Sequence, residues 1–483
     1  MTLTIPMDPA APVPLHRQVY VYLRDAILEG RLAPGEKVPS TRALSESLGV
    51  SRTTVTLGYE QLLSEGYLEA AVGSGTYVSR RLPGDLLPGN DSPGPSDIRI
   101  RLSAYGKRVR DAGAFDRRAA ALPVNFRHGR ADYTRFPMAV WRRLLLRHCR
   151  SAQPAMLDYA DDGQGYPPLR EAIARYLSRA RAVRCSAEQV IVVNGSQQAL
   201  DLIARVLLNP RDTAAVEDPC YGGARRAFES QGARLLPVPV DASGLVVERL
   251  QRYARRNPRI VYITPSHQFP TGFVLSLTRR LELLDWVEHT GAVIVEDDYD
   301  SEYRYAGHPL PSVQGLEEKG RVLYTGTFSK VLFPSLRIGY IVAPPSLAPV
   351  LARAKWLSDR QAPMMEQYAL ADFIGEGHLE RHIRRMRKLY DHRRRVLVAA
   401  LQRLGRRASV QGENAGMHIL VRLHTRCSAD EVVNRAAREG AGITSAAEYY
   451  IRASHSNEFV LGYANLTDAQ IEDGVRRLER AIT

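Results

Sequence analysis

The stretch TGTFSKVLFPSLRIGY occupies residues 325–340 and places Lys330 and Arg337 seven residues apart, at the end of the apolar run RVLYTG. A lysine amine can condense with an aldehyde to form a Schiff base. The hydroxyls of Thr327 and Ser329 can donate to a phosphate, and the planar guanidinium of Arg337 can bind that phosphate through two hydrogen bonds. The stretch therefore predicts a site for an aldehyde that carries a phosphate.

A second run, VIVEDDYDSEY at residues 293–303, places a carboxylate and a phenol at the end of a strand-like segment. Pyridoxal phosphate is an aldehyde of the required kind. It needs a carboxylate that keeps its pyridine nitrogen protonated, because that charge makes the ring an electron sink. Asp297 can supply the carboxylate, and the phenol of Tyr299 can tune the Schiff base from beside the ring oxygen.

A third run, NGSQQALD at residues 194–201, follows a strand-like segment and opens a helix. The backbone amides of Gly195, Ser196 and Gln197 are expected to face an anion at the N-terminus of that helix.

Two more motifs follow strand-like segments. EDPCY ends in Tyr221, whose ring suits stacking on a pyridine. TPSHQFPTG places His267 and Gln268 on a turn, where we expect both to contact the cofactor. Each motif is weak alone, since a lone Ser-Lys is usually a surface feature and a lone Asp at a strand end is usually a cap. Their succession at the ends of strands in one domain is much more specific.

Short apolar runs alternate with helical stretches from about residue 121 onwards. Because these runs are continuous and rich in β-branched residues, they predict a buried, mostly parallel sheet in an α/β domain. They lie at residues 189–193, 259–264, 292–297, 321–326 and 337–344. From about residue 360, long amphipathic helices followed by AGMHILVRL and EFVLGYA predict a smaller α+β domain.

The N-terminal residues follow a different pattern. Residues 15–29 have helical spacing, and Ser40 and Ser51 can cap two further helices. Two short β-prone runs on either side of Gly73-Ser74-Gly75 predict a hairpin. Three helices followed by a hairpin predict a winged helix-turn-helix.

The third of these helices opens with Ser51-Arg52-Thr53-Thr54. A recognition helix enters the major groove of DNA by its N-terminal end, where an arginine can bind the O6/N7 edge of guanine. Arg42, at the start of the second helix, is close enough in this geometry to contribute. The alternative is that Arg52 and the threonines merely cap and solvate a surface helix.

Composition divides the chain into three parts. We predict a DNA-binding domain at residues 12–80, a linker at 81–120 and a larger domain at 121–483, whose small subdomain begins at about residue 360. The linker begins with the Pro/Gly-rich run PGDLLPGNDSPGPSD. Its second, basic part, RIRLSAYGKRVRDAG, is expected to form an arm that packs on the larger domain.

The chain has a formal charge of +14, which suggests a polyanionic partner. Residues 1–81 nevertheless contain eight basic and eight acidic side chains. A DNA-binding head would therefore act by the arrangement of its charges, and the excess lies in the rest of the chain. We interpret the arginine-rich helix predicted at residues 376–403 as a solvated face, with a second DNA surface as the alternative.

Other features narrow the class of protein. We find no secretory signal and no run of about 18 apolar residues, so we expect a cytoplasmic protein with no membrane partner. The four cysteines are far apart and form no CxxC. We expect them to be reduced and mostly in the core, with no disulfide and no metal site.

The run from PLHRQVY to GSGTYV, residues 12–79, resembles the winged-helix domain of the GntR family. The resemblance implies double-stranded operator DNA as a partner. It implies DNA contacts at Arg42, Ser51, Arg52, Thr53, Thr54, Thr56 and Gly73.

Residues 121–483 resemble fold-type I aminotransferases, and TPSHQFPTG, EDDYDSEY and TGTFSK look like the MocR/GabR regulators, which fuse a GntR-type head to that fold. The resemblance implies pyridoxal 5'-phosphate as the cofactor, with Lys330 forming the internal aldimine and Asp297 binding the pyridine nitrogen. It also implies that Tyr299 contacts the ring oxygen, that Tyr221 stacks on the ring, and that the phosphate is held by Ser196, Gln197, Thr327 and Arg337.

Tyr159, in LDYADDGQGYPPLREAI, matches a tyrosine that such enzymes send into the neighbouring subunit's site. The resemblance therefore implies a homodimer with shared sites. In this subfamily the head of one subunit typically lies against the body of the other, which predicts a head-to-tail dimer.

The chain departs from the family pattern at the effector site. GABA-responsive members place an arginine two residues after the stacking tyrosine, where this chain has Gly223. Many fold-type I enzymes use an arginine near the C-terminus, and the corresponding region here reads Glu458-Phe459-Val460. Arg225, Arg226 and Arg452 are possible substitutes. The effector is therefore an amine or amino acid, or pyridoxal phosphate itself is the sensed molecule.

Three functions follow from these patterns. The first is a transcription regulator that senses the cofactor, or an amine that exchanges with Lys330. The second is a working aminotransferase whose head is secondary, an activity against which the missing carboxylate-binding arginines count. The third is a dimerisation scaffold that binds no cofactor.

Overall fold

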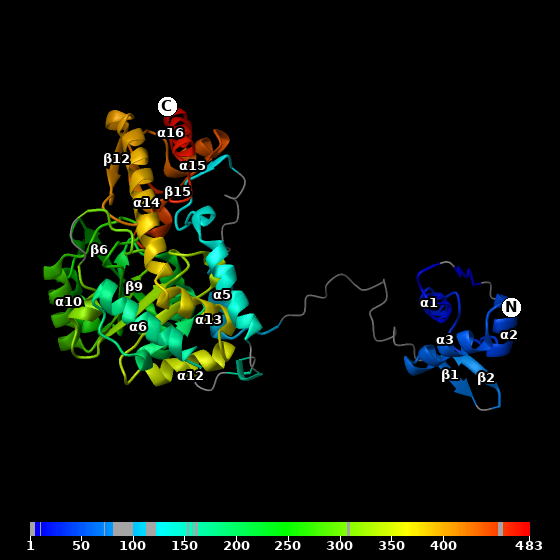
Figure 1. Ribbon diagram of the computed structural model, residues 1–483. Coiled ribbons are helices and arrows are strands. Elements are labelled where there is room, and N and C mark those ends of the chain that lie inside the picture. Colours follow the sequence, from blue (N-terminus) through cyan, green and yellow to red (C-terminus); the bar gives the residue numbers. More distant parts are fainter. Residues whose placement is uncertain are drawn as a thin grey trace. The chain divides into compact units, whose positions relative to one another are not determined.

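The computed structural model describes residues 5–9, 11–71, 73–80, 100–112, 122–151, 154–156, 158–159, 163–306, 310–452 and 457–483. The chain forms two compact units, residues 1–101 and 102–483, here called the head and the body. In Figure 1 the head is the blue part of the chain and the body runs from cyan to red.

The head contains the three predicted helices and the hairpin. The helices are α1 (Leu15–Leu28), α2 (Thr41–Leu48) and α3 (Arg52–Ser64), and β1 (Leu68–Ala71) pairs antiparallel with β2 (Gly75–Val78). The hydroxyl of Ser40 accepts a hydrogen bond from the Ala43 amide, and Gly49 ends α2 in the left-handed conformation. These capping interactions are those that the sequence predicts.

One small core holds the head together. Val19 and Leu23 of α1 pack with Val55 and Leu62 of α3, and the hairpin adds Val78. Because these apolar positions recur at helical spacing, they occupy one side of α3 and leave its other side free for other contacts.

The body is built on an eight-stranded sheet with the strand order β4-β11-β10-β9-β8-β5-β6-β7. Five neighbouring strands, from β10 to β6, run parallel, whereas β11 and β7 run antiparallel to their neighbours. The sequence prediction of a mostly parallel sheet is therefore confirmed. The strands are β4 (Val190–Val193), β5 (Thr213–Asp218), β6 (Arg234–Asp241), β7 (Gly244–Leu245), β8 (Ile260–Ile263), β9 (Val293–Asp298), β10 (Val322–Thr327) and β11 (Gly339–Val342).

Helices cover both faces of this sheet (Figure 1). Successive strand residues point to opposite faces, so Val295 packs with α7 and α8 while its neighbour Ile294 packs with α10. The first face carries α7 (Ser196–Leu207), α8 (Gly222–Ser230) and α12 (Ala348–Asp359). The second carries α10 (Leu277–Thr290), α5 (Met138–Arg150), α6 (Pro167–Arg181) and α13 (Met364–Gly375).

The C-terminal part forms the predicted α+β subdomain. Its sheet has the order β12-β13-β16-β15 and is antiparallel. A short parallel pair joins β14 to β3, so Val124 and Asn125 belong to this subdomain although they lie far from its other residues in the sequence. The elements are β3 (Val124–Asn125), α14 (His378–Gln402), β12 (Ala408–Gln411), β13 (His418–Leu423), α15 (Ala429–Arg438), β14 (Ala441–Gly442), β15 (Thr444–Ser445), β16 (Glu458–Gly462) and α16 (Asp468–Ile482).

Within the segment predicted as a linker, residues 81–99 and 113–121 lie outside the described residues. Between them, α4 (Ala104–Asp111) packs on the body, where the Arg108 Nε donates to the carbonyl of Ser230 at 2.7 Å. The predicted arm is therefore present. Among the helices that the structure describes, none is both long and apolar enough to cross a bilayer.

All four cysteines are free thiols, and three of them lie in a hydrophobic core or pack against one, as predicted. Cys220 is buried, Cys149 is exposed, and Cys185 and Cys427 are partly buried. Cys185 and Cys427 lie in loops that pack against the core, whereas Cys149 lies in the last turn of α5.

Several arginines of α14 bind other parts of the body, although most of its basic side chains are exposed. Arg387 donates to the carbonyl of Glu302 at 2.8 Å. Arg393 is 5% exposed and donates to Asp132 at 2.9 Å and to the carbonyl of Ala464 at 2.6 Å. These contacts count against a second DNA surface on α14. The exposure of most of its basic side chains agrees with the interpretation of a solvated face, and the buried Arg393 is the exception.

We predict that Arg393→Ala lowers the free energy of unfolding of the body by about 3–5 kcal/mol, because the Asp132 carboxylate is left buried with its cation removed. Arg395 is the matched control, since its side chain is 66% exposed and pairs with Asp391 at the surface. Arg395→Ala should cost less than about 1 kcal/mol. All three tryptophans lie in the body, so urea unfolding followed by tryptophan fluorescence reports on this unit. Equal losses for the two variants would contradict the role of the buried pair.

Candidate functional site

The predicted site residues of the body lie at one edge of the large sheet. Asp297 is near the end of β9, Lys330 follows β10, and Gly195 follows β4. Tyr221 follows β5, and His267 follows β8. Because the carboxyl ends of parallel strands meet at the same edge, segments far apart in the sequence converge there.

Lys330 is partly buried and its Nζ donates to the carbonyl of Gly129 at 3.0 Å. A Cβ placed on Gly129 would lie 2.5 Å from this Nζ, so a larger residue could not approach the amine so closely. Burial lowers the pKa of the Lys330 amine, while the carboxylates of Asp300 and Asp297 oppose that shift. A lowered pKa raises the fraction of neutral, nucleophilic amine.

Asp297 is 4% exposed and accepts two hydrogen bonds from neighbouring strands. The Tyr262 hydroxyl donates to its Oδ2 at 2.8 Å, and the Thr325 hydroxyl donates to its Oδ1 at 3.2 Å. Burial raises the pKa of Asp297 to about 6, and the two donors and Lys330 partly offset this effect. The carboxyl group is thus oriented and ready to pair with a cation.

A cradle for an anion lies where β4 leads into α7. Gly195 precedes α7 with a φ of 86°, and a Cβ there would lie 3.1 Å from the Arg337 guanidinium. Arg337 also donates to the carbonyl of Asn194, while the Ser329 Oγ is buried without a hydrogen-bond partner among the described residues. A helix N-terminus, a guanidinium and an orphaned hydroxyl together suit a phosphate.

Gln197 and Tyr221 lie together beside this cradle. The Gln197 Nε2 donates to the carbonyl of Gly223 at 3.1 Å, and a Cβ on Gly223 would lie 2.4 Å from both the Gln197 Oε1 and the Tyr221 ring. Tyr221 meets Phe269 edge to face, with ring centroids 5.7 Å apart.

Two other predicted ligands have their polar atoms engaged within the protein. The Thr327 hydroxyl accepts a hydrogen bond from the Ser329 amide at 3.1 Å. The Gln268 Nε2 donates to Glu217, Pro219 and Phe269, while its Oε1 accepts from Thr271. Gln268 therefore braces the turn after β8, and a direct contact of its amide with the cofactor would require these bonds to rearrange.

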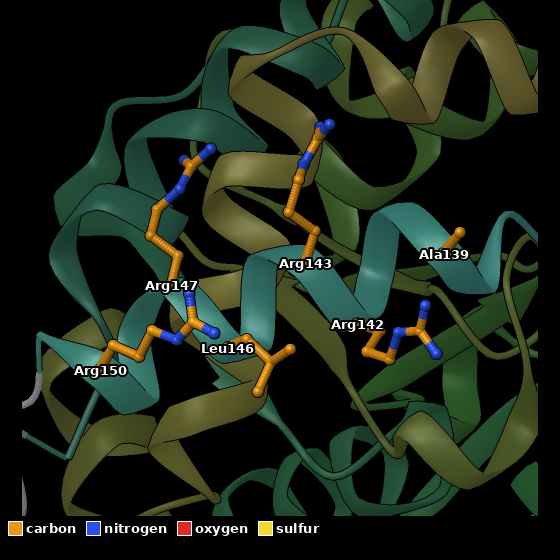
Figure 2. A pocket seen from close by; sticks show the side chains of 6 residues that line it. All are labelled: Ala139, Arg142, Arg143, Leu146, Arg147 and Arg150. Atoms are coloured by element: carbon orange, nitrogen blue, oxygen red, sulfur yellow. The ribbon is translucent and has the colours of Figure 1, made fainter.

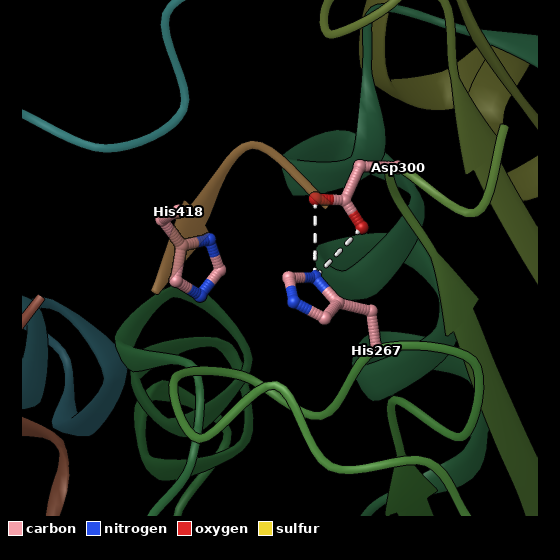
Figure 3. A group of neighbouring side chains, drawn as sticks. All are labelled: His267, Asp300 and His418. Atoms are coloured by element: carbon pink, nitrogen blue, oxygen red, sulfur yellow. Dashed lines mark hydrogen bonds and ion pairs between the residues drawn. The ribbon is translucent and has the colours of Figure 1, made fainter. Parts of the chain in front are cut away.

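Tyr299 belongs to a hydrogen-bonded cluster that Figure 3 shows in part. The Tyr299 hydroxyl donates to the carbonyl of His267 at 2.9 Å and lies 3.1 Å from its Nδ1. This Nδ1 is also 3.1 Å from Asp300, and the ring centroids of His267 and His418 are 4.7 Å apart.

The nitrogen and oxygen atoms of His267, Asp300 and His418 lie within 4.8 Å of one another, an arrangement in which a metal ion could be held. The sequence predicted no metal site. Asp300 is already bound to His267, and the His418 Nε2 lies 3.3 Å from the carbonyl of Pro270, so we interpret the group as a hydrogen-bonded cluster.

Several residues of the site were missed in the sequence. No local sequence pattern marked their roles, because their positions depend on strands and loops that meet only in the fold. They are Gly129, Tyr262, Asp300 and His418. His128 is a further case: burial lowers the pKa of its imidazole to about 3, and its Nδ1 has no partner in the described part of the chain.

Tyr159 lies at the surface of its own subunit. Its ring is 64% exposed, and the Arg360 guanidinium lies 4.1 Å from the ring centroid. Of the arginines considered for an effector carboxylate, Arg225 pairs with Glu229 at 3.1 Å and Arg452 donates to the Tyr253 hydroxyl at 2.9 Å. Arg226 lies close enough to Tyr221 to oppose the rise that burial causes in the pKa of its phenol.

In the head, the N-terminus of α3 presents Arg52 and Thr53 to solvent. The Ser51 hydroxyl accepts from the Thr54 amide at 3.1 Å and bonds to its hydroxyl at 2.8 Å, while Thr56 donates to the carbonyl of Arg52. Arg42 pairs with Glu46, both being largely exposed, and the wing residue Gly73 has a φ of 80°. The exposed first turn of α3 is the arrangement that a recognition helix requires.

Two family models match the chain. Residues 15–78 match the bacterial regulatory proteins of the gntR family, and residues 125–478 match the aminotransferases of class I and II. The second match spans well over half of the chain. The residues at the sheet edge fit pyridoxal phosphate, the cofactor of this aminotransferase family: a lysine, a buried carboxylate and a phosphate cradle are all in place.

Full-length relatives have both parts in the same order. A probable rhizopine catabolism regulatory protein, MocR, from Rhizobium meliloti is 42% identical, over 98% of this chain and 95% of that protein. The pyridoxine biosynthesis transcriptional regulator PdxR of Corynebacterium glutamicum is 32% identical, over 96% and 95% respectively.

The body also matches solved aminotransferases. The crystal structure of LysN, an α-aminoadipate aminotransferase from Thermus thermophilus complexed with N-(5'-phosphopyridoxyl)-L-leucine, aligns with a TM-score of 0.72 and 32% identity. The alignment covers 79% of this chain and 98% of that one. With a GntR-type head in front of this fold, the chain belongs to the MocR/GabR subfamily of GntR-family transcription regulators.

Proposed function

We propose that the protein senses pyridoxal phosphate, or an amine or amino acid that competes for Lys330, and changes its hold on operator DNA in response. The observation that carries this proposal is the presence, in one chain, of an exposed recognition turn at Arg52 and a complete set of cofactor-binding groups around Lys330. A ligand can act as such a switch when it binds one arrangement of the protein better than another.

When bound, pyridoxal phosphate supplies an electron-poor ring and an aldehyde. Lys330 would provide the amine that holds the aldehyde; it is positioned by the carbonyl of Gly129, and burial lowers its pKa. Asp297, oriented by Tyr262 and Thr325, would keep the pyridine nitrogen protonated. Arg337 and the amides at Gly195, Ser196 and Gln197 would hold the phosphate at the N-terminus of α7.

We further propose a homodimer with shared sites, in which Tyr159 enters the partner's site. The exposure of this ring in its own subunit favours such a contact. We also propose that the two subunits exchange their heads in a head-to-tail arrangement. The proposed location is the cytoplasm. The proposal also includes the contacts of Tyr221 and Tyr299 with the cofactor ring. It further includes domain boundaries at residues 12–80, 81–120 and 121–483.

An active aminotransferase is the second candidate. The intact group of Lys330, Asp297 and Arg337 favours it, and a 2-aminoadipate transaminase of Thermus thermophilus is 34% identical over 72% of this chain. Against it, Arg225 and Arg452 already bind within the body and Gly223 replaces an arginine. Steady-state assays with a panel of amino donors and keto acids decide between the two, and robust multiple turnover would favour the enzyme.

We predict that Lys330→Ala abolishes the visible absorbance of lysine-bound pyridoxal phosphate, because the protein loses the amine that attaches the aldehyde. Lys319→Ala is the control, since Lys319 is 64% exposed and pairs with Glu288 at the surface. This control should keep the absorbance. Tryptophan fluorescence checks that both variants fold, and an absorbance band that persists in folded Lys330→Ala protein would assign the attachment to another lysine.

We predict that pyridoxal phosphate alters the binding of the wild-type protein to the DNA upstream of its own gene, and that Lys330→Ala protein loses this response. Affinity, footprint and bending are measured with and without the cofactor. Indifference of all three in the wild-type protein would refute sensing of pyridoxal phosphate, while leaving DNA binding intact. Repeating the measurements with candidate amines then tests them as effectors.

We predict that Arg52→Ala weakens binding to the operator more than binding to random DNA, by about 1–3 kcal/mol of discrimination, because a guanine contact is lost. Arg31→Ala removes the same charge from the head, but Arg31 pairs with Glu29. This control should affect both DNAs equally. A uniform loss with Arg52→Ala as well would mean that Arg52 contacts phosphate rather than bases.

A further inference from the structure

The positive charge of the chain is concentrated in one short region of the body. Residues 101–150 contain thirteen arginines and lysines but three acidic residues, a net charge of +10 within a total of +14. The head, by contrast, carries no net charge over residues 1–81. The groups that account for the basic character of the protein are therefore largely found in this region.

Four of these arginines form one face of α5. Trp141 and Leu144 bury the opposite side of the helix against the body. The exposed face lines a shallow hollow of about 510 Å³ (Figure 2). Its lining residues are Ala139, Arg142, Arg143, Leu146, Arg147 and Arg150. Their spacing of three and four places them on one side of the helix, along about 17 Å of its length.

This face keeps much of its charge uncompensated. Arg147 donates to Asp372 at 2.9 Å and to Glu376 at 2.7 Å. Arg143 is 60% exposed and 3.8 Å from Glu376. Arg142 and Arg150 are exposed and have no acidic partner within the described residues. Arg142 and Arg150 are thus available to an outside anion, and Arg143 pairs only with a carboxylate that Arg147 already binds.

DNA is a suitable anion for this face, because the head carries no net charge over residues 1–81 and the body would supply cations for the DNA phosphates. Proteins gain most of their sequence-independent affinity for DNA by neutralising phosphates with lysine and arginine. In the head, Arg24, Arg31 and Arg42 are each paired with a carboxylate. The body belongs to the same chain as the recognition helix, so any phosphate contact it makes occurs at a high effective concentration.

We propose that the exposed face of α5 binds the phosphate backbone of double-stranded DNA, as a sequence-independent contact that adds to base recognition by the head. The proposal rests on the DNA-binding function proposed above. A row of arginines over about 12 Å can reach more than one phosphate, whereas a small anion would occupy a single position. A second copy packed symmetrically on this face would oppose arginines to arginines, which is unfavourable.

The test combines Arg142→Ala, Arg143→Ala and Arg150→Ala in the full-length protein and leaves the ion-paired Arg147 in place. Affinity is measured over a range of salt concentrations with an operator duplex and with a random duplex of equal length. We expect the slope of log K against log salt to become shallower by about 2 to 3, because about 0.9 is lost per phosphate contact. The ratio of the two affinities should stay unchanged, since backbone contacts carry no sequence information.

The matched control combines Arg249→Ala, Arg252→Ala and Arg255→Ala, which removes the same charge from exposed positions elsewhere on the body. It should leave the slope within about 0.5 of the wild-type value, because no phosphate contact is lost. An unchanged slope in the α5 variant, or an equal change in the control, would overturn the proposal. Dissociation of the α5 variant in sedimentation with an unchanged slope would instead identify the face as a subunit contact, and would also overturn it.

These outcomes are distinct from a failure of the proposed function. Wild-type protein that binds no duplex at all would refute both ideas. Another combination of results would refute this inference alone. In it, the wild-type protein binds the operator and the Arg52→Ala variant loses discrimination, but the α5 triple variant keeps the wild-type salt slope.

Discussion

The body depends on a carboxylate that is kept away from water at the end of a parallel strand. Asp297 is almost fully buried, and such a group is costly unless donors and cations compensate for its lost hydration. Tyr262 and Thr325 supply hydrogen bonds from the two flanking strands, β8 and β10. One electrostatic unit then forms from the Asp297 carboxylate, the neighbouring amine of Lys330 and the anion cradle at α7. A bound cofactor would offer each of these groups a partner of opposite charge.

The same constraint explains why the site is surrounded by polar groups without a direct role toward the ring. Gln268 braces the turn after β8, and Asp300 holds the His267 imidazole beside the Tyr299 hydroxyl. Buried polar groups of this kind are costly when unpaired and rigid when fully paired. The Ser329 hydroxyl, like the His267 Nε2 and the His128 Nδ1, has no partner among the described residues, so a bound ligand would satisfy it.

Charge is divided between the two units in an unusual way for a DNA-binding protein. The head carries no net charge over residues 1–81, and several of its arginines are paired with carboxylates, so its recognition turn reads DNA with few free cations. The body carries the excess, most densely between residues 101 and 150. On α14 this charge stabilises the fold through Arg393 and Arg387, whereas on α5 it faces solvent. Arginines therefore differ in role between the two helices: some of those on α14 stabilise the fold, whereas those on α5 face solvent.

Much of the protein was predictable from local sequence. Helix caps such as Ser40 and Ser51, the hairpin around Gly73 and the continuous apolar strands depend on neighbours within a few residues, so their signals survive without a fold. Lys330, Asp297 and Arg337 were accessible for the same reason, because each lies close to a strand that is visible in the sequence. Tertiary structure alone decided that Gly129 meets the Lys330 amine, that Tyr262 holds Asp297, and which arginines are buried in ion pairs. Those contacts join segments up to 261 residues apart, and no local pattern records a neighbour that only folding brings close.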